Sequence, residues 1–412
     1  MRSLEPAAEV GRLLDLDLSG AWAVDPATGR EGPADLVVRH GVLEAVSWLG
    51  TRAASGIDGG GVVVAPGFTD LHAHLRQPGN EAAETIASGL TAAAHGGFTT
   101  VCAMPNTTPA LDHAWLVAGF QAAVAAAASP VAAIPFGAAT AGRAGEQLAA
   151  LGELADAGVA GFTDDGAPTH SASLFRNALA YAGGLGLPLV DHPEDPSLTE
   201  GAEAHEGLVA TVLGLRGWPA AAEASAVARD LAILADVVGD VAGARLHLTH
   251  LSTAGSLELV RVAKAAGLPV TCDVTPHHLA LSDEWLAGSR RFAWQALDEK
   301  GSARDPWRDA ALVAPPYETS LRVNPPLRSP VDAAACLAAV VDGTADAIAT
   351  DHAPHAAIDK AVEFGLAANG ITGLETALGL VLEAVDAGRL ALATAIQALT
   401  TGPARVLGRG DA

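Results

Sequence analysis

The chain has 412 residues, of which 50% are hydrophobic, and its 47 acidic and 24 basic residues give a formal net charge of −23. This length and hydrophobic content suit one large barrel-sized domain with a small accessory domain, not a disordered tail protein. The acidic balance, without any run of basic residues, argues against nucleic acid or an anionic membrane surface as a partner.

Residues 1–65 are predicted to form a small β-domain. Two stretches of alternating polarity, Asp35–Arg39 and Leu43–Trp48, are separated by the turn sequence Arg39-His40-Gly41. Alternation with a period of two residues is typical of half-buried strands.

Residues 66–404 show short apolar runs that alternate with helical patterns, which is typical of a parallel sheet in an α/β protein. Eight runs are predicted strands: Phe68–Ala73, Thr99–Met104, Val131–Phe136, Val159–Thr163, Leu187–Asp191, Arg245–Thr249, Val270–Val274 and Ala345–Thr350. Eight such units close a (β/α)8 barrel of the TIM type, in which the chemistry lies at the carboxyl ends of the strands. Residues 405–412 are expected to be a short C-terminal tail.

Residues 282–322, between the seventh and eighth strands, depart from this rhythm. Their cations include Arg290, Arg291, Lys300, Arg304 and Arg308. A connection of this length is uncommon unless it is functional or disordered. Because it emerges on the active-site face, we expect it to cover the site or to dock a partner, with an exposed surface loop as the alternative.

Localisation is indicated by the N-terminus, the apolar stretches and the cysteines. The first ten residues lack the apolar run of a secretory signal, and the most hydrophobic stretch, residues 117–136, contains Pro130 and Pro135, so neither export nor a membrane span is expected. Three cysteines without a CxxC pair indicate neither a disulfide framework nor a thiolate zinc site. A reducing cytoplasm fits this pattern.

Histidines and carboxylates at strand ends form the candidate metal site. Alternation along the first barrel strand points His72 and His74 to the same side, close enough to share one ion. Four more candidate ligands follow the fourth, fifth, sixth and eighth strands: Asp165, His192, His250 and Asp351. Four imidazoles and two carboxylates suit zinc or a similar ion, and that number suits two ions better than one.

The few lysines limit the choice of a bridging ligand. The chain contains only Lys264, Lys300 and Lys360, so no lysine is available on the fourth strand to bridge two ions as a carbamate. If the site is binuclear, either Asp165 or Asp164 must supply the bridging carboxylate.

Four polar residues are candidates for binding a substrate. Arg76 offers a planar, bidentate fork for a carboxylate, and an anionic substrate of so acidic a protein needs such a local cation. Asn106, Asn324 and His355 lie at predicted strand ends or in loops on the same face. Each of these three is equally well explained as a turn residue, most readily Asn324, which precedes a proline.

The motifs together resemble those of the dihydroorotases, type I branch, in the amidohydrolase superfamily. The resemblance covers most of the chain and rests on PGFTDLHAHLR at 66–76, GGFTTVCAMPNT at 96–107, FTDDG at 162–166, HPED at 192–195, HLST at 250–253, TPHH at 275–278, VNPPLR at 323–328, IATDHAPH at 348–355 and GLET at 373–376. His277 and His278 in the TPHH motif are interpreted as structural.

The resemblance implies an enzyme that interconverts (S)-dihydroorotate and N-carbamoyl-L-aspartate in pyrimidine biosynthesis. It implies two zinc ions per subunit, Asp165 as their bridge, and Asp351 as both a ligand and the catalytic group that moves the proton. The implied metal ligands are His72, His74, Asp165, His192, His250 and Asp351. The implied substrate-binding residues are His74, Arg76, Asn106, Asn324, His355, Asn369 and Gly370. A homodimer and an association with aspartate carbamoyltransferase are further expectations.

Four features depart from the family pattern. Pro193 replaces the usual cysteine after the fifth-strand histidine, and Asn369-Gly370 stands where many members have Phe-Gly. The segment 282–322 is longer than usual. Relatives continue beyond Ala412 with strands that complete the small β-domain, so this domain is expected to be built from the N-terminal segment, with its C-terminal strands short or missing.

Two alternative functions stay open. A hydantoinase-like or allantoinase-like hydrolase would share fold and metals but open a different ring; the absent lysine and the presence of Arg76 count against it. A catalytically silent scaffold for aspartate carbamoyltransferase would have lost metal ligands, and none is lost here.

Overall fold

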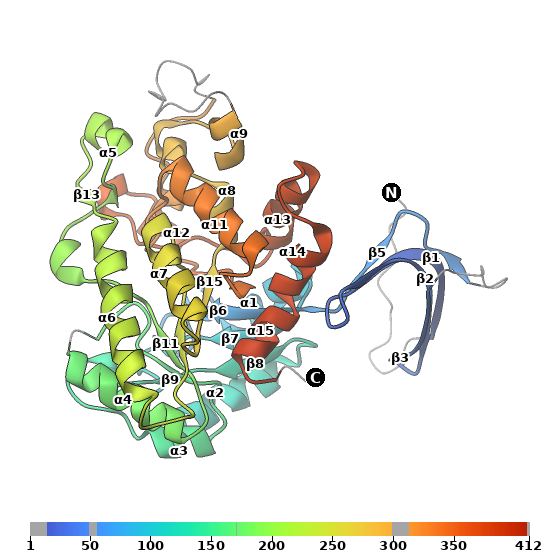
Figure 1. Ribbon diagram of the computed structural model, residues 1–412, viewed down its shortest axis with the longest axis horizontal. Coiled ribbons are helices and arrows are strands. Elements are labelled where there is room, and N and C mark those ends of the chain that lie inside the picture. Colours follow the sequence, from blue (N-terminus) through green and yellow to red (C-terminus); the bar gives the residue numbers. More distant parts are fainter. Residues whose placement is uncertain (1–14, 49–55, 170, 299–312, 410–412) are drawn as a thin grey trace. The chain divides into compact units, whose positions relative to one another are not determined.

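The computed structural model describes residues 15–48, 56–169, 171–298 and 313–409 (Figure 1). The chain divides into two compact units, Met1–Pro66 and Gly67–Ala412. Within the described residues, every helix is too short or too polar to cross a membrane.

The first unit is a five-stranded sheet. Its strands are β1 (Leu16–Asp25), β2 (Arg30–Arg39), β3 (Val42–Trp48), β4 (Ile57–Asp58) and β5 (Val63–Val64), in the order β3-β2-β1-β4 with β5 also on β1. His40 and Gly41 join the antiparallel β2 and β3, and their φ values of 51° and 75° are those of a two-residue hairpin turn. The two predicted alternating stretches are therefore paired strands.

The second unit is a barrel of eight parallel strands, as predicted. They are β6 (Phe68–Ala73), β7 (Phe98–Ala103), β8 continued by β9 (Ala132–Pro135 and Gly137–Ala138), β10 (Phe162–Thr163), β11 (Leu189–Asp191), β14 (Leu246–Leu248), β15 (Val270–Val274) and β16 (Ala347–Ile348). Ladders join β6-β7-β8 and β9-β10-β11-β14-β15-β16. The ring closes where Ala73 pairs in parallel with His352.

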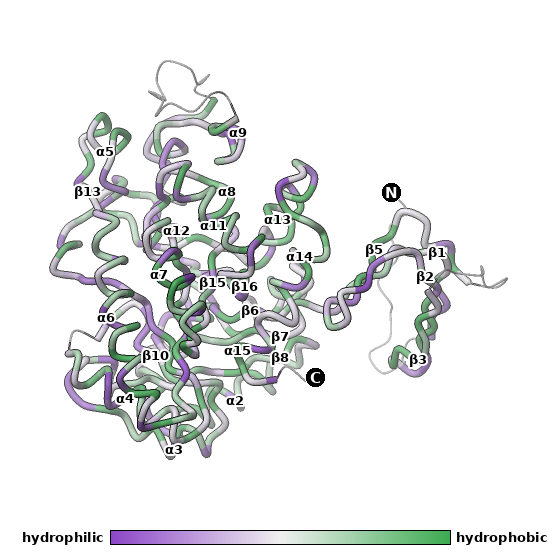
Figure 2. The backbone as a smooth tube through the Cα atoms, viewed as in Figure 1, coloured by the Kyte–Doolittle hydropathy of each residue, from purple (hydrophilic) through white to green (hydrophobic). Residues whose placement is uncertain are grey.

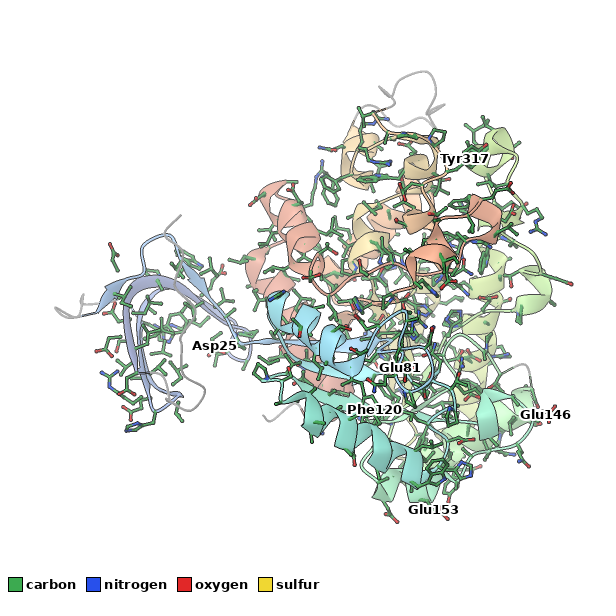
Figure 3. The ribbon with its side chains drawn as sticks, turned by 180° about the vertical axis from the view of Figure 1, so that it is seen from behind. Asp25, Glu81, Phe120, Glu146, Glu153 and Tyr317 are labelled. Atoms are coloured by element: carbon green, nitrogen blue, oxygen red, sulfur yellow. The ribbon has the colours of Figure 1, made fainter. Side chains whose placement is uncertain are left out.

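Helices cover the outside of the barrel (Figure 1). They include α1 (Ile86–His95), α2 (Ala114–Ala127), α3 (Leu151–Asp156), α4 (Ala172–Gly184), α6 (Ala221–Val237), α7 (Ala254–Ala265), α11 (Pro330–Asp342), α13 (Ala377–Asp386), α14 (Leu392–Leu399) and α15 (Thr401–Val406). Hydrophobic residues recur along strands and helices alike (Figure 2). In α2 the buried side chains are Leu116, Val117 and Phe120, at the helical spacing of one face; Phe120 is labelled in Figure 3.

Apolar side chains fill the barrel interior. Leu71, Cys102, Phe136, Val190 and Ala347, which come from or adjoin five different strands, pack in one buried cluster. Because the interior is a packed core, a substrate has access only at a rim of the barrel.

One excursion lies between β11 and α6. It consists of a short helix, α5 (Leu208–Leu213), between two strands that pair with each other in parallel, β12 (Ala204–His205) and β13 (Gly217–Trp218). The sequence analysis did not predict these elements.

The segment 282–322 is partly described. It contains the 3₁₀ helices η3 (Asp283–Ala287) and η4 (Thr319–Leu321) and the helix α9 (Ala293–Asp298). Lys300, Arg304 and Arg308 lie outside the described residues. Ser282, Leu286, Ser289 and Trp294 are all buried, so the interpretation as an exposed loop is wrong for residues 282–294.

Aromatic and basic side chains of this segment make contacts both within it and with α5. The Arg290 guanidinium lies 5.0 Å from the centre of the Trp285 ring, and the hydroxyl of Tyr317 (Figure 3) donates to the carbonyl of Leu213 at 2.7 Å. The segment is thereby tied to α5.

Candidate metal centre and substrate pocket

Six buried side chains meet at the carboxyl ends of the barrel strands. They are His72 and His74 from the end of β6, Asp165 after β10, His192 after β11, His250 after β14 and Asp351 after β16. Each residue is between 0% and 6% exposed. The structure therefore brings together all six residues that the sequence predicts as metal ligands.

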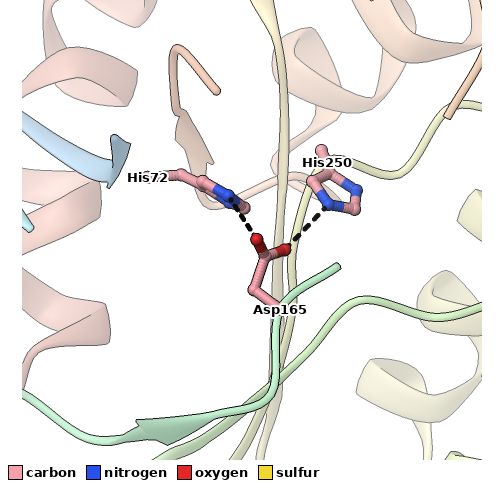
Figure 4. Close-up of side chains that lie close together, drawn as sticks. All are labelled: His72, Asp165 and His250. Carbon is pink, nitrogen blue, oxygen red and sulfur yellow. Dashed lines mark ion pairs between the residues drawn. The ribbon is translucent and has the colours of Figure 1, made fainter. Parts of the chain in front are cut away.

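Asp165 lies at the centre of this cluster. Its Oδ2 atom is 3.4 Å from His72 Nε2 and 3.5 Å from His74 Nε2. Its Oδ1 atom is 3.4 Å from His192 Nδ1 and 3.5 Å from His250 Nε2. Figure 4 shows the carboxylate between His72 and His250. One carboxylate thus faces two pairs of imidazoles, one pair on each oxygen.

Asp351 joins the first pair of imidazoles. Its Oδ1 atom is 3.2 Å from His74 Nε2 and 3.5 Å from His72 Nε2. The backbone is in the left-handed region at two residues of the cluster, with φ of 46° at Asp351 and 40° at His250. Such left-handed values are uncommon for residues other than glycine and cluster at functional sites.

Hydrogen bonds outside the cluster fix which ring nitrogen faces inward. His74 Nδ1 lies 2.8 Å from Asn106 Oδ1, and His192 Nε2 lies 3.2 Å from Glu194 Oε2. Because these oxygens only accept, the two nitrogens donate, so the neutral imidazoles that a metal binds would have their lone pairs on His74 Nε2 and His192 Nδ1, which face the cluster.

Electrostatics show that the cluster attracts positive charge. Burial by itself lowers the pKa of His72, but the carboxylates of Asp165 and Asp351 outweigh it and raise this pKa to about 9. Burial likewise lowers the pKa of His192, yet the carboxylates of Asp165 and Glu194 raise it to about 10. Burial raises the pKa of Asp165, but the surrounding imidazoles hold it well below its usual range.

These residues fit a divalent metal. The Nε2 atoms of His72 and His74 are only 3.2 Å apart, and Asp165 Oδ1 is buried without a hydrogen bond from any described residue. Two overlapping sets of side chains could each hold an ion, His72 with Asp165 and His250, and His72 with His74 and Asp351. Imidazole nitrogens and carboxylate oxygens form a donor set that zinc accepts.

Asp164 has a different environment from its neighbour. It accepts hydrogen bonds from the backbone nitrogens of Ala139 and Thr140, at 3.0 and 3.1 Å, and from the Thr140 hydroxyl. Its oxygens are therefore used by the loop after β9. Of the two aspartates that the sequence left open, Asp165 alone faces the imidazoles.

The described lysines lie away from the cluster. Lys264 pairs with Asp346 at 2.5 Å, and the Lys360 ammonium donates to backbone carbonyls, including that of Ala368 at 2.7 Å. Lys300 is outside the described residues. Among the described residues, the group between the imidazole pairs is therefore the carboxylate of Asp165, not a lysine carbamate.

A cavity of about 600 Å³ opens onto the cluster. All seven residues that the sequence predicts as substrate-binding line it: His74, Arg76, Asn106, Asn324, His355, Asn369 and Gly370. The turn-residue interpretation of Asn106, Asn324 and His355 does not account for this convergence.

Arg76 supplies a fixed cation in this cavity. Its Nε atom donates to the carbonyl of Pro354 at 3.0 Å, which orients the guanidinium. His355 Nε2 is 2.7 Å from the carbonyl oxygen of Asn369 and therefore carries a proton, so its 3.3 Å approach to Arg76 joins two donors. Burial and the nearby Arg76 both lower the pKa of His355, so its one proton stays on Nε2 toward Asn369, and the outer nitrogens of Arg76 are the donors of this pair that are left for an anion.

The Asn369-Gly370 pair shapes the cavity mainly through its backbone. The Asn369 side chain accepts from Arg322 Nε at 2.9 Å. Gly370 has φ of 148°, and a Cβ at this position would lie 2.4 Å from the carbonyl oxygen of Ala353. Only glycine therefore fits this position.

Sequence reasoning missed the residues that support the ligands. The Thr249 hydroxyl lies 2.8 Å from His72 Nδ1, and Asp273 accepts from the backbone nitrogen of His250 at 2.6 Å. Burial raises the pKa of Glu194, but hydrogen bonds from His192 and other groups lower it to about 2, so it accepts as a carboxylate. Thr249 and Glu194 each lie within two residues of a predicted ligand, whereas Asp273 has no such signal in the sequence.

A buried ion pair holds the loops on one side of the site. Arg328 is 2% exposed, and its Nε donates to the Ser252 hydroxyl at 3.0 Å. Glu223 lies 3.7 Å from the Arg328 guanidinium and accepts from the backbone nitrogens of Ser252 and Thr253. The segment that carries Asn324 is thereby tied to the segment that carries His250.

His278 has the contacts of a structural residue. Its Nδ1 atom is 2.8 Å from the Thr275 hydroxyl, and its Nε2 atom is 3.0 Å from the carbonyl of Pro325. Its neighbour His277 is 3% exposed, and burial lowers its pKa to about 4.

The barrel and this set of ligands define the class, a metal-dependent hydrolase of the amidohydrolase type. A family model described as dihydro-orotase-like matches residues 61–256. The dihydroorotase of Anaeromyxobacter dehalogenans is 46% identical over 395 residues, which are 95% of this chain and 84% of the relative. That of Pelotomaculum thermopropionicum is 43% identical over 397 residues, which are 96% of this chain and 85% of the relative. The chain belongs to the dihydroorotase family.

Solved structures share the fold at lower identity. The L-hydantoinase of Arthrobacter aurescens superposes with a TM-score of 0.76 at 22% identity and covers 96% of this chain and 82% of its own. A D-hydantoinase gives a TM-score of 0.70, also at 22% identity, and covers 95% of this chain and 81% of its own. These likenesses confirm the barrel architecture.

Proposed function

We propose that this chain is a zinc-dependent dihydroorotase that interconverts (S)-dihydroorotate and N-carbamoyl-L-aspartate. The observation that carries the proposal is the position of Asp165, which turns one oxygen to each of two imidazole pairs beside a cavity whose fixed cation is Arg76. The identity of 46% to a protein named dihydroorotase supports the choice of substrate.

Two zinc ions per subunit are the cofactors in this proposal. His72, His74 and Asp351 would hold one ion, His192 and His250 the other, and Asp165 would bridge them. When bound, zinc supplies Lewis acidity toward a carbonyl oxygen and lowers the pKa of water.

The substrate is held by groups on the cavity wall. The Arg76 fork matches the two oxygens of the substrate carboxylate. Asn106 accepts from His74 through Oδ1, so its Nδ2 group is left to donate to the same carboxylate. His355 lies beside Arg76 on the same wall, with its Nε2 proton toward the carbonyl oxygen of Asn369.

Asp351 moves the proton. Burial raises its pKa, but the charges of His72 and His74 lower it below the usual range, so the group is a carboxylate that can accept a proton. A water oxygen forms a bond to the ring amide carbon, Asp351 takes a proton from that water, and it returns the proton to the ring nitrogen as the C–N bond breaks. The same carboxylate works in the opposite order when the ring closes and water leaves.

Metal analysis combined with two hydrolysis assays tests the proposal. We expect two equivalents of zinc per chain and turnover of dihydroorotate well above that of hydantoin. Preference for hydantoin would favour the hydantoinase-like alternative, and a metal-free chain without turnover would favour the scaffold.

Location and assembly belong to the same proposal. Cys102, Cys272 and Cys336 are buried and free, which supports a reducing cytoplasm. The homodimer and the association with aspartate carbamoyltransferase stay predictions. Sedimentation velocity of the chain, with and without the transferase, measures both.

A further inference from the structure

Glu194 is a mostly buried carboxylate that contacts both a predicted metal ligand and a predicted substrate contact without facing the metal cluster directly. Its side chain is 11% exposed. Its Oε2 atom lies 3.2 Å from His192 Nε2 and 3.1 Å from Asn324 Nδ2. Its Oε1 atom accepts from the Thr199 hydroxyl. One carboxylate thus joins a predicted metal ligand to a predicted substrate contact that lies 130 residues away in the chain.

The contact to Asn324 decides how that amide is turned. A carboxylate only accepts, so the Nδ2 group of Asn324 must face Glu194. The Oδ1 atom of Asn324 then lies on the other side of the amide, and it is buried without a hydrogen bond from any described residue. Asn324 lines the substrate cavity, and this oxygen is the polar atom of its side chain that has no partner among the described residues.

Asn106 on the same wall is turned the opposite way. Its Oδ1 atom accepts from His74 Nδ1 at 2.8 Å, so its Nδ2 group is the part left for a ligand. The cavity therefore offers a donor beside Arg76, where a carboxylate fits, and an acceptor at Asn324, where an N–H group fits. A cyclic amide that carries a carboxylate has both groups.

We propose that Glu194 is a positioning residue with two roles, both carried by its Oε2 atom. It decides whether Asn324 presents an acceptor or a donor to the substrate, which is called the polarity of the site below, and it fixes the tautomer of His192. It holds Asn324 with its carbonyl oxygen toward the cavity, where that oxygen accepts from a ring N–H of the substrate. It also keeps the proton of His192 on Nε2, so that Nδ1 keeps the lone pair that a metal needs. The first part rests on the proposed function, since it names a cyclic amide as substrate; the second does not.

Substitutions at both ends of the contact test the polarity. His192 Nε2 and Asn324 Nδ2 meet the same oxygen of Glu194, Oε2. In Glu194→Gln, an amide oxygen in that place still accepts from both, and the amide NH₂ faces Thr199, so the polarity is kept. In Glu194→Ala, nothing holds the amide of Asn324 with its oxygen toward the cavity. In Asn324→Asp, two carboxylates face each other.

In zinc-loaded protein, we expect Glu194→Ala and Asn324→Asp each to raise KM for dihydroorotate at least ~10-fold, as for a lost or reversed hydrogen bond of about 1.4 kcal/mol. Glu194→Gln is expected to keep KM within a few fold of the wild type, with kcat less affected than KM throughout. Glu203→Gln is a matched control, because Glu203 is 14% exposed and pairs with Arg216 outside the cavity. It should change neither KM nor zinc content.

Zinc affinity tests the second part without any assay of activity. Glu194→Ala removes the acceptor for His192 and should weaken zinc binding by about 10–100-fold in competition with a chromophoric chelator, whereas Glu194→Gln should stay near the wild type. Circular dichroism and thermal melts establish that each variant is folded.

Three results separate the possible failures. A folded, zinc-loaded Glu194→Ala variant with the KM of the wild type would overturn the polarity role, and the same variant with wild-type zinc affinity would overturn the role toward His192. A wild-type protein that binds zinc but does not turn over dihydroorotate would overturn the proposed function. In that case the polarity role is overturned with it, and the zinc measurements still decide the role toward His192.

Discussion

Asp351 touches both imidazoles of the first pair and is the only residue proposed both to bind metal and to move a proton. Asp351→Asn keeps an oxygen near His74 but cannot accept a proton. We expect kcat to fall at least ~100-fold while zinc content stays close to that of the wild type. Steady-state kinetics and elemental analysis of the same preparation measure the two effects. A variant with near wild-type turnover would contradict the assigned role.

The two neighbouring aspartates should respond differently to truncation. Asp165→Ala removes the carboxylate that faces four imidazoles, so zinc content and activity should both be lost. Asp164→Ala removes hydrogen bonds to the backbone of Ala139 and Thr140, so it should lower stability by about 1–3 kcal/mol and leave zinc bound. Zinc content and urea midpoints distinguish the two effects. Loss of zinc only in the Asp164 variant would mean that the wrong carboxylate is assigned.

Arg76 differs from lysine in ways that the cavity uses. Its Nε atom is engaged by the carbonyl of Pro354 at 3.0 Å, while the outer nitrogens remain for a ligand. Lysine has one nitrogen and cannot do both, so Arg76→Lys should raise KM for dihydroorotate strongly, by roughly 10-fold or more. The outcome that speaks against this role is an unchanged KM.

The residues that the sequence could predict are those whose chemistry shows in their type and position. His72, Asp165 and the other candidate ligands stand at strand ends, and parallel strands bring such ends together. Glu194 and Asp273 were not predicted, because their role depends on which atom of which neighbour they touch. Nor did the sequence separate Asp164 from Asp165, since one residue along a loop reverses which side chain faces the barrel axis.

At the scale of elements, the strand pattern was predicted and the irregular pieces were not. The third strand is divided at Phe136 into β8 and β9, which pair with different ladders. The excursion of β12, α5 and β13 lacks the long apolar runs that mark barrel strands. Short elements of two residues are held by tertiary contacts rather than by local pattern, so periodicity does not reveal them.

The stability of the protein should depend on pH through Asp283, a buried residue of the segment 282–298. Asp283 is 6% exposed, and burial together with the nearby Glu284 and Asp332 raises its pKa to about 7. In the unfolded chain this group has a pKa of about 4. Between these two values the unfolded chain releases a proton that the folded chain keeps, so the free energy of unfolding falls as pH rises, and the full cost is present above pH 7.

Asp283→Asn should remove this cost. The variant should gain stability relative to the wild type as pH rises from 4 to 7, by up to about 4 kcal/mol at pH 8. Urea midpoints of both proteins at pH 4.5 and 8 measure the change. Asp386→Asn, at the exposed end of α13, is the control and should show no such difference. A gain from Asp283→Asn of the same size at both pH values would contradict the explanation.

At the scale of the whole molecule, metal binding should stabilise the folded barrel. The six candidate ligands come from five strand ends and are close together only when the barrel is formed, so zinc binds the folded state in preference to the unfolded chain. Stability should therefore rise with free zinc, by about 2.7 kcal/mol at a concentration 100-fold above Kd. Thermal melts with zinc and with chelator test this, and in Asp165→Ala the melting temperature should not respond to either.

The order of the ligands along the chain has a consequence for synthesis on the ribosome. Asp165, His192 and His250 have all been made by residue 250, whereas the set of His72, His74 and Asp351 waits for the last barrel strand, about a hundred residues later. At roughly 5–20 residues per second, that interval lasts about 5–20 s. The first strand must wait for the same partner, because Ala73 closes the ring against His352. A nascent chain therefore holds the ligands of one half-site well before it can form the other, and the last strand to emerge completes the barrel and the second half-site in a single event.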